Sequence, residues 1–191
     1  FHRQTMQRRD SPSRRREGMT VAYDAMMFAR KVHKDQVRKY TGNPYVDHLA
    51  EVAGIAMSVG WHETTIHPDM IMAVCWLHDC MEDQGVTPID LGAIGMPWTV
   101  VGGVMDLSDM ETGNRAARKA ASRARLAAAP SWVQTIKCAD LISNTSSIVR
   151  HDPEFAKVYL EEKRLLLDVL TKADPQLRDL ARSLAEQGAQ S

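Results

Sequence analysis

Cysteine is scarce in this sequence: only Cys75, Cys80 and Cys138 occur, and no two form a Cys-x-x-Cys pair. This scarcity argues against a disulfide framework and fits a reducing, cytoplasmic compartment. No stretch approaches the roughly 18 consecutive apolar residues that span a bilayer. The start of the chain also lacks the apolar segment of a signal peptide. We therefore expect no membrane association.

Aromatic residues make up only 6% of the chain, and its four tryptophans fall in separate segments. Scattered tryptophans favour packing in the core over a platform for stacking nucleic-acid bases.

Net charge is absent, with 24 basic and 24 acidic residues, but the charges are unevenly placed. Residues 1–18 contain six arginines and only two acidic residues, so we expect a basic, disordered tail. The remainder consequently has more acidic than basic residues, which makes nucleic acid an unlikely partner. The length of 191 residues suits one compact domain, placed at residues 19–187.

Apolar residues after Met19 recur with the spacing of helices, and no segment alternates long enough for a strand. Turn-forming residues such as Thr41-Gly42-Asn43-Pro44 separate these segments. The sequence thus predicts an all-α, single-domain bundle of about eight to ten helices. The expected helices cover residues 21–36, 45–59, 69–82, a short segment opened by a capping box at 87–90, 98–107, 115–129, 132–149, 153–172 and 175–187.

Four titratable residues directly follow the apolar run at positions 70–77, namely His78, Asp79, Glu82 and Asp83. Burying such a cluster is costly unless a cation or hydrogen-bonding partners compensate it. The four-residue spacings place the groups on two adjoining stripes of one helix. Imidazole nitrogen and carboxylate oxygen together suit zinc, manganese or iron. A divalent metal site is therefore predicted here.

Two further segments contribute to the same pattern. Asp140 is followed four residues later by Asn144, and His48 lies in the segment Asn43-Pro44-Tyr45-Val46-Asp47-His48. Taken singly, Asp140 would be a surface carboxylate and His48 an ordinary core residue. In chain order, however, the three segments read as His, then His-Asp with Glu-Asp, then Asp with Asn.

This ordered pattern resembles the HD-domain metal-dependent phosphohydrolases, and among them the hydrolase domain of RelA/SpoT proteins and the small alarmone hydrolases. The resemblance covers roughly residues 22–168. It implies metal ligands for Mn²⁺, a catalytic acidic pair, and residues that bind a nucleotide substrate. The implied ligands are His48, His78, Asp79 and Asp140; the catalytic pair is Glu82 and Asp83; the substrate-binding residues are Arg38, Lys39, Asn144, Ser147, Arg115, Arg118 and Tyr159, with Lys163 in the same segment as Tyr159.

The reaction implied by the resemblance is hydrolysis of the 3′-pyrophosphate of (p)ppGpp by a metal-bound hydroxide. The products would be GDP and pyrophosphate, which would terminate alarmone signalling. Leu141 stands where the long bifunctional relatives usually have arginine, and Thr145-Ser146 where they have Met-Arg. The nucleotide is therefore open: NADPH, through its 2′-phosphate, or an adenosine alarmone are alternatives. A non-catalytic nucleotide sensor is a further alternative, against which the intact Glu82-Asp83 pair argues.

Overall fold

The computed structural model describes residues 20–61 and 65–189, so the basic segment 1–18 lies outside the described residues. Within these ranges the chain forms ten helices, and its only β pairing is an isolated bridge between Val37 and Pro44. This confirms the all-α prediction. The helices are α1 (Val21–Val32), α2 (Tyr45–Ala56), α3 (Pro68–Leu77), α4 (Cys80–Gln84), α5 (Pro88–Ala93), α6 (Trp98–Leu107), α7 (Arg115–Ala128), α8 (Ser131–His151), α9 (Pro153–Val169) and α10 (Pro175–Gly188).

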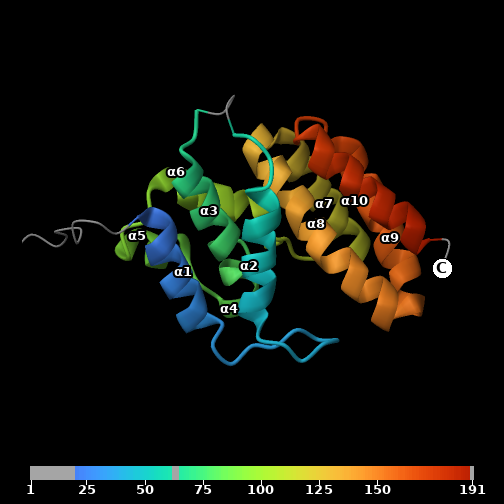
Figure 1. Cartoon of the computed structure of the whole chain (residues 1–191), viewed down its shortest axis with the longest axis horizontal. Helices are drawn as coiled ribbons and strands as arrows, with labels where there is room; N and C mark the ends of the chain where they lie inside the picture. The colour runs from blue at the N-terminus through green and yellow to red at the C-terminus, as the bar shows by residue number, and fades with distance from the viewer. Residues whose placement is uncertain (1–19, 62–64, 190–191) are drawn as a thin grey trace, which may run out of the picture.

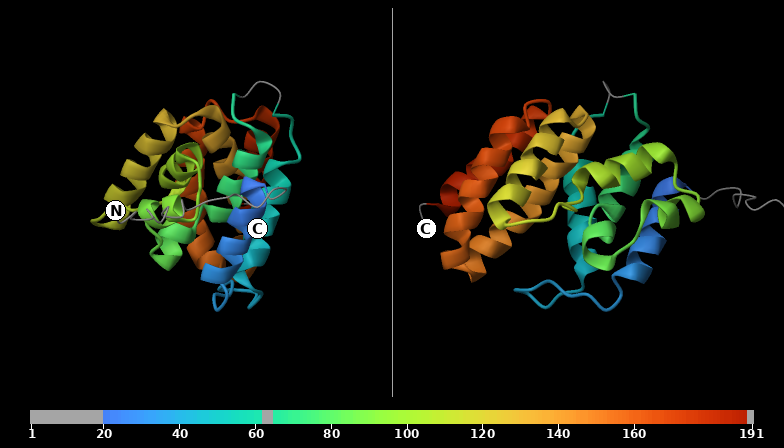
Figure 2. Two further views of the ribbon diagram at one scale, coloured as in Figure 1. Left: turned by 90° about the vertical axis from the view of Figure 1, so that its left-hand side faces the viewer. Right: turned by 180° about the vertical axis from the view of Figure 1, so that it is seen from behind.

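Two helices, α3 and α8, organise the packing (Figure 1). Helix α3 contacts α1, α2 and α6, whereas α8 contacts α2, α6, α7, α9 and α10. The N-terminal helices consequently form one side of the molecule, and α7–α10 form the other, as the views in Figure 2 also show. Helix α2 touches both α3 and α8, so it bridges the two sides. Residues far apart in the sequence meet along this contact.

The predicted helix over residues 69–82 is instead two helices, α3 and α4, separated at His78 and Asp79. The backbone of Asp79 has φ −100° and ψ −3°, outside regular helix geometry. Its carboxylate accepts a hydrogen bond from Tyr45 and lies close to the His78 ring, which compensates for the lost helical turn. The apolar pattern gave no sign of this break because it runs unbroken up to Leu77.

Helix starts follow the predicted capping chemistry. The Thr87 hydroxyl accepts a hydrogen bond from the Asp90 backbone, and the Asp90 carboxylate accepts one from the Thr87 backbone, completing the capping box of α5. Some helix ends were predicted too late: α2 ends at Ala56, yet Val59 still packs against the core from the loop. Because Val59 is apolar but lies outside the helix, it made the helical pattern in the sequence look longer than the helix itself.

Tryptophan packing agrees with the prediction only in part. Trp76 and Trp132 are buried in the main core, and Trp61 packs partly against it. Trp98, however, is 74% exposed at the first position of α6, so its assignment to the core was wrong. Among the described residues, none of the helices combines the length and apolar character that crossing a bilayer requires.

Candidate metal centre

Four predicted ligands converge where α2, the α3–α4 junction and α8 meet. His48 comes from α2, His78 and Asp79 from the junction, and Asp140 from α8. The Nε2 atom of His48 lies 3.3 Å from an Asp140 oxygen and 3.5 Å from an Asp79 oxygen. The Nε2 atom of His78 lies 3.0 Å from the same Asp79 oxygen. Ligand atoms of His48, His78 and Asp140 all lie within 4.8 Å of one another.

The tautomer of His78 is set by its own helix. Its Nδ1 lies 2.8 Å from the Cys75 carbonyl oxygen, which can only accept a hydrogen bond. Nδ1 therefore keeps its proton, and when the ring is neutral its lone pair lies on Nε2, which faces the carboxylates. This Nε2 is buried and makes no hydrogen bond to any described residue. A lone pair so placed is what a cation requires.

His48 is oriented in the same way by two residues that the sequence did not single out. Its Nδ1 lies 2.8 Å from the Ser143 hydroxyl, and that hydroxyl donates at 2.6 Å to Glu51. Because the single hydroxyl proton goes to Glu51, Ser143 accepts the Nδ1 proton of His48. The buried Nε2 of His48 is also left without a hydrogen bond among the described residues.

Each carboxylate of the centre is held by a neighbouring donor. Tyr45 donates to Asp79 at 2.6 Å. Lys137 donates at 2.8 Å to one oxygen of Asp140, and Asn144 donates at 2.7 Å to the other. Most of the hydrogen-bonding capacity of Asp140 is therefore used, but its Oδ1 still faces both imidazoles. Carboxylates fixed in this way lose little freedom when they bind an ion.

Burial and mutual attraction act in opposite directions on the pKa values of the cluster. Burial lowers the pKa of His78, but the negative charges of Asp79 and Asp140 raise it well above its usual value, so a cation that binds here must displace a proton from Nε2. Burial likewise raises the pKa of Asp140, but Lys137 and the two imidazoles bring it well below the ordinary range. Against the effect of burial, the two imidazoles also lower the pKa of Asp79, so the protein holds both carboxylates ionised, as metal binding needs.

Two buried histidine nitrogens, neither with a hydrogen bond among the described residues, and carboxylate oxygens fit a divalent transition metal. Without a cation, protons on the imidazoles compensate the carboxylate charges, and a divalent ion can take their place. The residues present therefore suit the metal that the sequence predicted.

The predicted acidic pair lies on α4, and each of its two side chains is held by a different segment of the chain. Glu82 accepts a hydrogen bond of 3.0 Å from the backbone of Asp109, and Asp83 accepts one of 2.8 Å from Gln36. Desolvation of the Glu82 carboxyl raises its pKa, and the nearby Asp109 and Asp79 charges act in the same direction. A carboxyl with a raised pKa is suited to exchanging protons with a water molecule.

Arg38 and Lys39 are neighbours in sequence but point to different places. The Arg38 guanidinium reaches inward, with hydrogen bonds to Glu51 at 2.9 Å and to the Ser143 carbonyl at 3.2 Å. The Lys39 ammonium lies on the outside, 3.2 Å from the Tyr40 hydroxyl and 3.7 Å from Asp152. Arg38 is thus beside the predicted metal ligands, whereas Lys39 extends toward the start of α9.

The other predicted substrate-binding residues lie on α7, α8 and α9. Arg115 forms a paired hydrogen bond with Glu162, at 2.6 and 2.8 Å, and covers the Phe155 ring. Tyr159 is buried, with its hydroxyl 3.5 Å from Thr145. Arg118 is exposed, and Ser147 is half-buried. Among the described residues, no hydrogen bond or ion pair joins any of these four side chains to the predicted metal ligands.

Sequence reasoning missed Glu51, Ser143, Tyr45 and Lys137 as parts of the centre. Lys137 had a usable signal, since it precedes Asp140 by three residues on one helix. Tyr45 was part of the matched motif but had no assigned role. Glu51 and Ser143 lie 92 residues apart, and neither has a distinctive local pattern.

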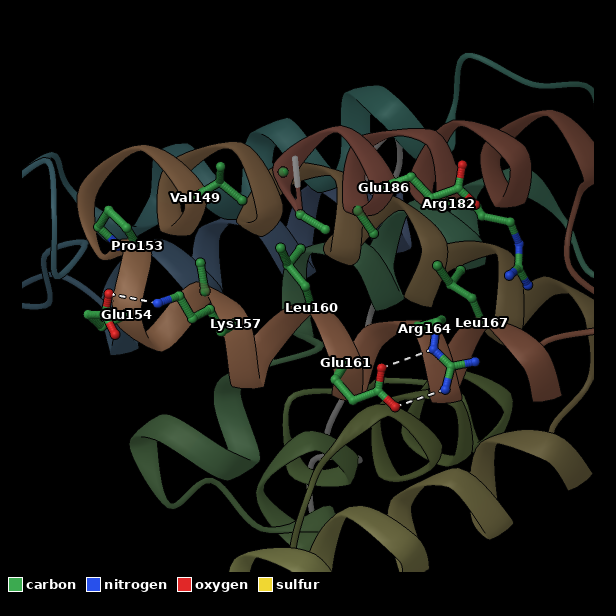
Figure 3. Close-up of a pocket in the computed structure, with 14 residues that line it drawn as sticks. Val149, Pro153, Glu154, Lys157, Leu160, Glu161, Arg164, Leu167, Arg182 and Glu186 are labelled. Carbon is green, nitrogen blue, oxygen red and sulfur yellow. Dashed lines mark hydrogen bonds and ion pairs between the residues drawn. The ribbon is translucent and has the colours of Figure 1, made fainter. Parts of the chain in front are cut away.

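A cavity lies elsewhere in the molecule, among α8, α9 and α10 (Figure 3). It has a volume of about 590 Å³, and Leu160 and Leu167 are among the residues that line it. Its rim carries ion pairs, including Glu161 with Arg164. None of the predicted metal ligands or substrate-binding residues lines it. It is therefore separate from the metal centre.

Comparison with known proteins supports the fold. No family model matches this sequence. The structure is similar to that of a metazoan ortholog of SpoT, which hydrolyzes ppGpp and plays a role in starvation responses. The TM-score is 0.76 at 22% sequence identity, covering 94% of this chain and 98% of that chain. A second similar structure is that of lmo0812 from Listeria monocytogenes EGD-e, with a TM-score of 0.63 at 20% identity, covering 80% of this chain and all of that chain. The predicted resemblance to HD-type hydrolases is thus confirmed as a shared fold.

Proposed function

We propose that this protein is a Mn²⁺-dependent phosphohydrolase that removes the 3′-pyrophosphate of guanosine tetra- or pentaphosphate. The observation that carries the proposal is the convergence of the buried Nε2 atoms of His48 and His78 on Asp79 and Asp140. Ligand atoms of His48, His78 and Asp140 all lie within 4.8 Å of one another, as a bound divalent ion requires. The fold shared with a ppGpp-hydrolysing protein supports guanosine alarmones as the first substrates to test.

In the proposed reaction, a water oxygen bonds to the phosphorus on the ribose 3′ oxygen. The bond between that phosphorus and the 3′ oxygen breaks, and ppGpp becomes GDP and pyrophosphate. When bound by His48, His78, Asp79 and Asp140, a divalent cation lowers the pKa of a coordinated water and polarises phosphoryl oxygens.

The chain's own residues would position the reactants and move the protons. Glu82 and Asp83 would orient the attacking water, accept its proton and return one to the 3′ oxygen. Arg38 would neutralise phosphate charge with its planar guanidinium, and Lys39 would attract the outer phosphates. Asn144, between Arg38 and Asp140, would contact the base or the sugar.

The direct test is to incubate metal-stripped protein with ppGpp, with and without Mn²⁺, and to separate the nucleotides by ion exchange. GDP and pyrophosphate formed only with Mn²⁺ would support both the substrate and the metal. NADPH and an adenosine alarmone belong in the same panel. Turnover of one of these, with ppGpp left intact, would overturn the guanosine assignment but keep the phosphohydrolase. Binding without any product, in protein shown to hold Mn²⁺, would favour a nucleotide sensor.

A further inference from the structure

A continuous chain of hydrogen bonds runs behind the metal ligand His48. The Oε2 atom of Glu51 accepts from Arg38 at 2.9 Å and from the Ser143 hydroxyl at 2.6 Å. The Ser143 hydroxyl in turn faces His48 Nδ1 at 2.8 Å. Glu51 lies on α2, three residues after His48, and Ser143 lies on α8. The chain therefore joins the two helices that carry His48 and Asp140.

The direction of these bonds decides which nitrogen of His48 is free. With Glu51 accepting the hydroxyl proton, Ser143 can only accept from Nδ1, so the lone pair of the neutral ring lies on Nε2. If the Glu51 acceptor were removed, the hydroxyl could rotate and donate to Nδ1. The neutral ring would then carry its proton on Nε2, which would block the metal.

Arg38 holds this acceptor in place. Its side chain is only 12% exposed, and its other terminal nitrogen donates to the Ser143 carbonyl oxygen at 3.2 Å. The guanidinium therefore spans Glu51 and Ser143, which keeps the half-exposed Glu51 carboxylate turned toward the hydroxyl. Without Arg38, the Glu51 carboxylate could rotate freely at the surface and would not stay directed at the Ser143 hydroxyl.

We propose that Glu51 and Ser143 are positioning residues that fix His48 in its metal-binding tautomer. They act through His48 and do not touch the metal. The inference rests on the proposed metal-dependent function, but it concerns the binding of Mn²⁺ and not the identity of the substrate. Partners that orient a metal-bound histidine typically change metal affinity by about 10–100-fold.

The test measures Mn²⁺ affinity in the full-length, metal-stripped protein by electron paramagnetic resonance of the free ion. Glu51→Leu and Ser143→Ala should each weaken Mn²⁺ binding by about tenfold or more. Glu51→Gln keeps an acceptor oxygen and should stay within about threefold of the parent protein. Because both residues act through one hydrogen bond, the double variant Glu51→Leu/Ser143→Ala should bind about as weakly as the weaker single variant.

Matched controls separate this role from general damage. Asp47→Asn changes an exposed acid on the same helix as Glu51, and Ser146→Ala changes an exposed serine on the same helix as Ser143. Both should bind Mn²⁺ like the parent, and circular dichroism should show every variant folded.

Unchanged affinity in a folded Glu51→Leu variant would overturn the inference, as would a Glu51→Gln variant as weak as Glu51→Leu. Fully additive losses in the double variant would also overturn it. If the parent protein itself bound no Mn²⁺, the proposed function would fail first, so the two failures are distinguishable.

Discussion

Tyr45 donates a hydrogen bond of 2.6 Å to Asp79, joining the first residue of α2 to the junction between α3 and α4. The same Asp79 oxygen lies 3.0 Å from Nε2 of His78. Burial and the charge of Asp79 both raise the pKa of Tyr45, so the phenol remains a donor at neutral pH. Asp79 is thereby fixed at the point where the helix is interrupted.

Asp79→Asn keeps the size of the side chain but removes its charge from the centre. We expect Mn²⁺ content after dialysis to fall at least about tenfold, with hydrolysis lost together with the metal. Elemental analysis by mass spectrometry measures the metal, and Asp47→Asn is the control. An Asp79→Asn protein that kept a full complement of Mn²⁺ and normal turnover would refute this ligand assignment.

Gln36 places Asp83, because its amide donates to that carboxylate while its oxygen lies 2.6 Å from His33 Nδ1. Gln36→Leu should lower kcat by about tenfold, with Mn²⁺ content unchanged, if Asp83 handles protons of the water.

Asn144→Ala should instead mainly raise KM. Steady-state kinetics on Mn²⁺-loaded protein separates these effects. Equal changes of kcat and KM in both variants would argue against the division of roles.

Gly103 and Gly102 are adjacent on α6 but differ in what surrounds them. A Cβ atom at Gly103 would lie 2.8 Å from Trp132 Cζ3 and 3.2 Å from a Val74 methyl, whereas one at Gly102 would meet nothing within 4 Å. Gly103→Ala should therefore lower the free energy of unfolding by about 1–3 kcal/mol.

Gly102→Ala, the matched control, should raise it by about 0.5–1 kcal/mol, because alanine favours the helix. Urea denaturation measures both variants. A Gly103→Ala protein as stable as Gly102→Ala would show that α6 and α8 do not pack as described.

Lys163 makes stability depend on pH. Burial lowers its pKa from 10.5 to about 8, and the charge of Lys137 acts in the same direction. Its protonated form is thus disfavoured in the fold, so Lys163 destabilises the protein below about pH 8 and ceases to do so as pH rises toward 10.5. Lys163→Met should be more stable than the parent at pH 7, and this advantage should shrink by pH 10.

Urea titrations at the two pH values measure the effect. Lys157→Met removes an exposed lysine paired with Glu154 on the same helix, and should change stability little at either pH. A Lys163→Met variant equally destabilised at pH 7 and pH 10 would contradict the explanation.

The convergence of the four candidate ligands could be predicted because their spacing is local or repeats a known order. His78 and Asp79 are adjacent, and the burial expected after an apolar run already made them conspicuous. The link from Glu51 through Ser143 to His48 was not predictable, because it depends on how α2 packs against α8. The helix break at His78 was missed for a related reason: long-range contacts of Asp79 override a local pattern that favours a continuous helix.

The ion pair between Lys137 and Asp140 has an electrostatic consequence for the whole centre. Asp79 and Asp140 together supply two negative charges, and the buried Lys137 offsets one of them. In the empty centre the remaining charge favours protons on the imidazoles, whose pKa values are raised. A divalent ion that displaces these protons supplies positive charge in their place. The carboxylates therefore stay compensated in a region shielded from water, with or without the ion.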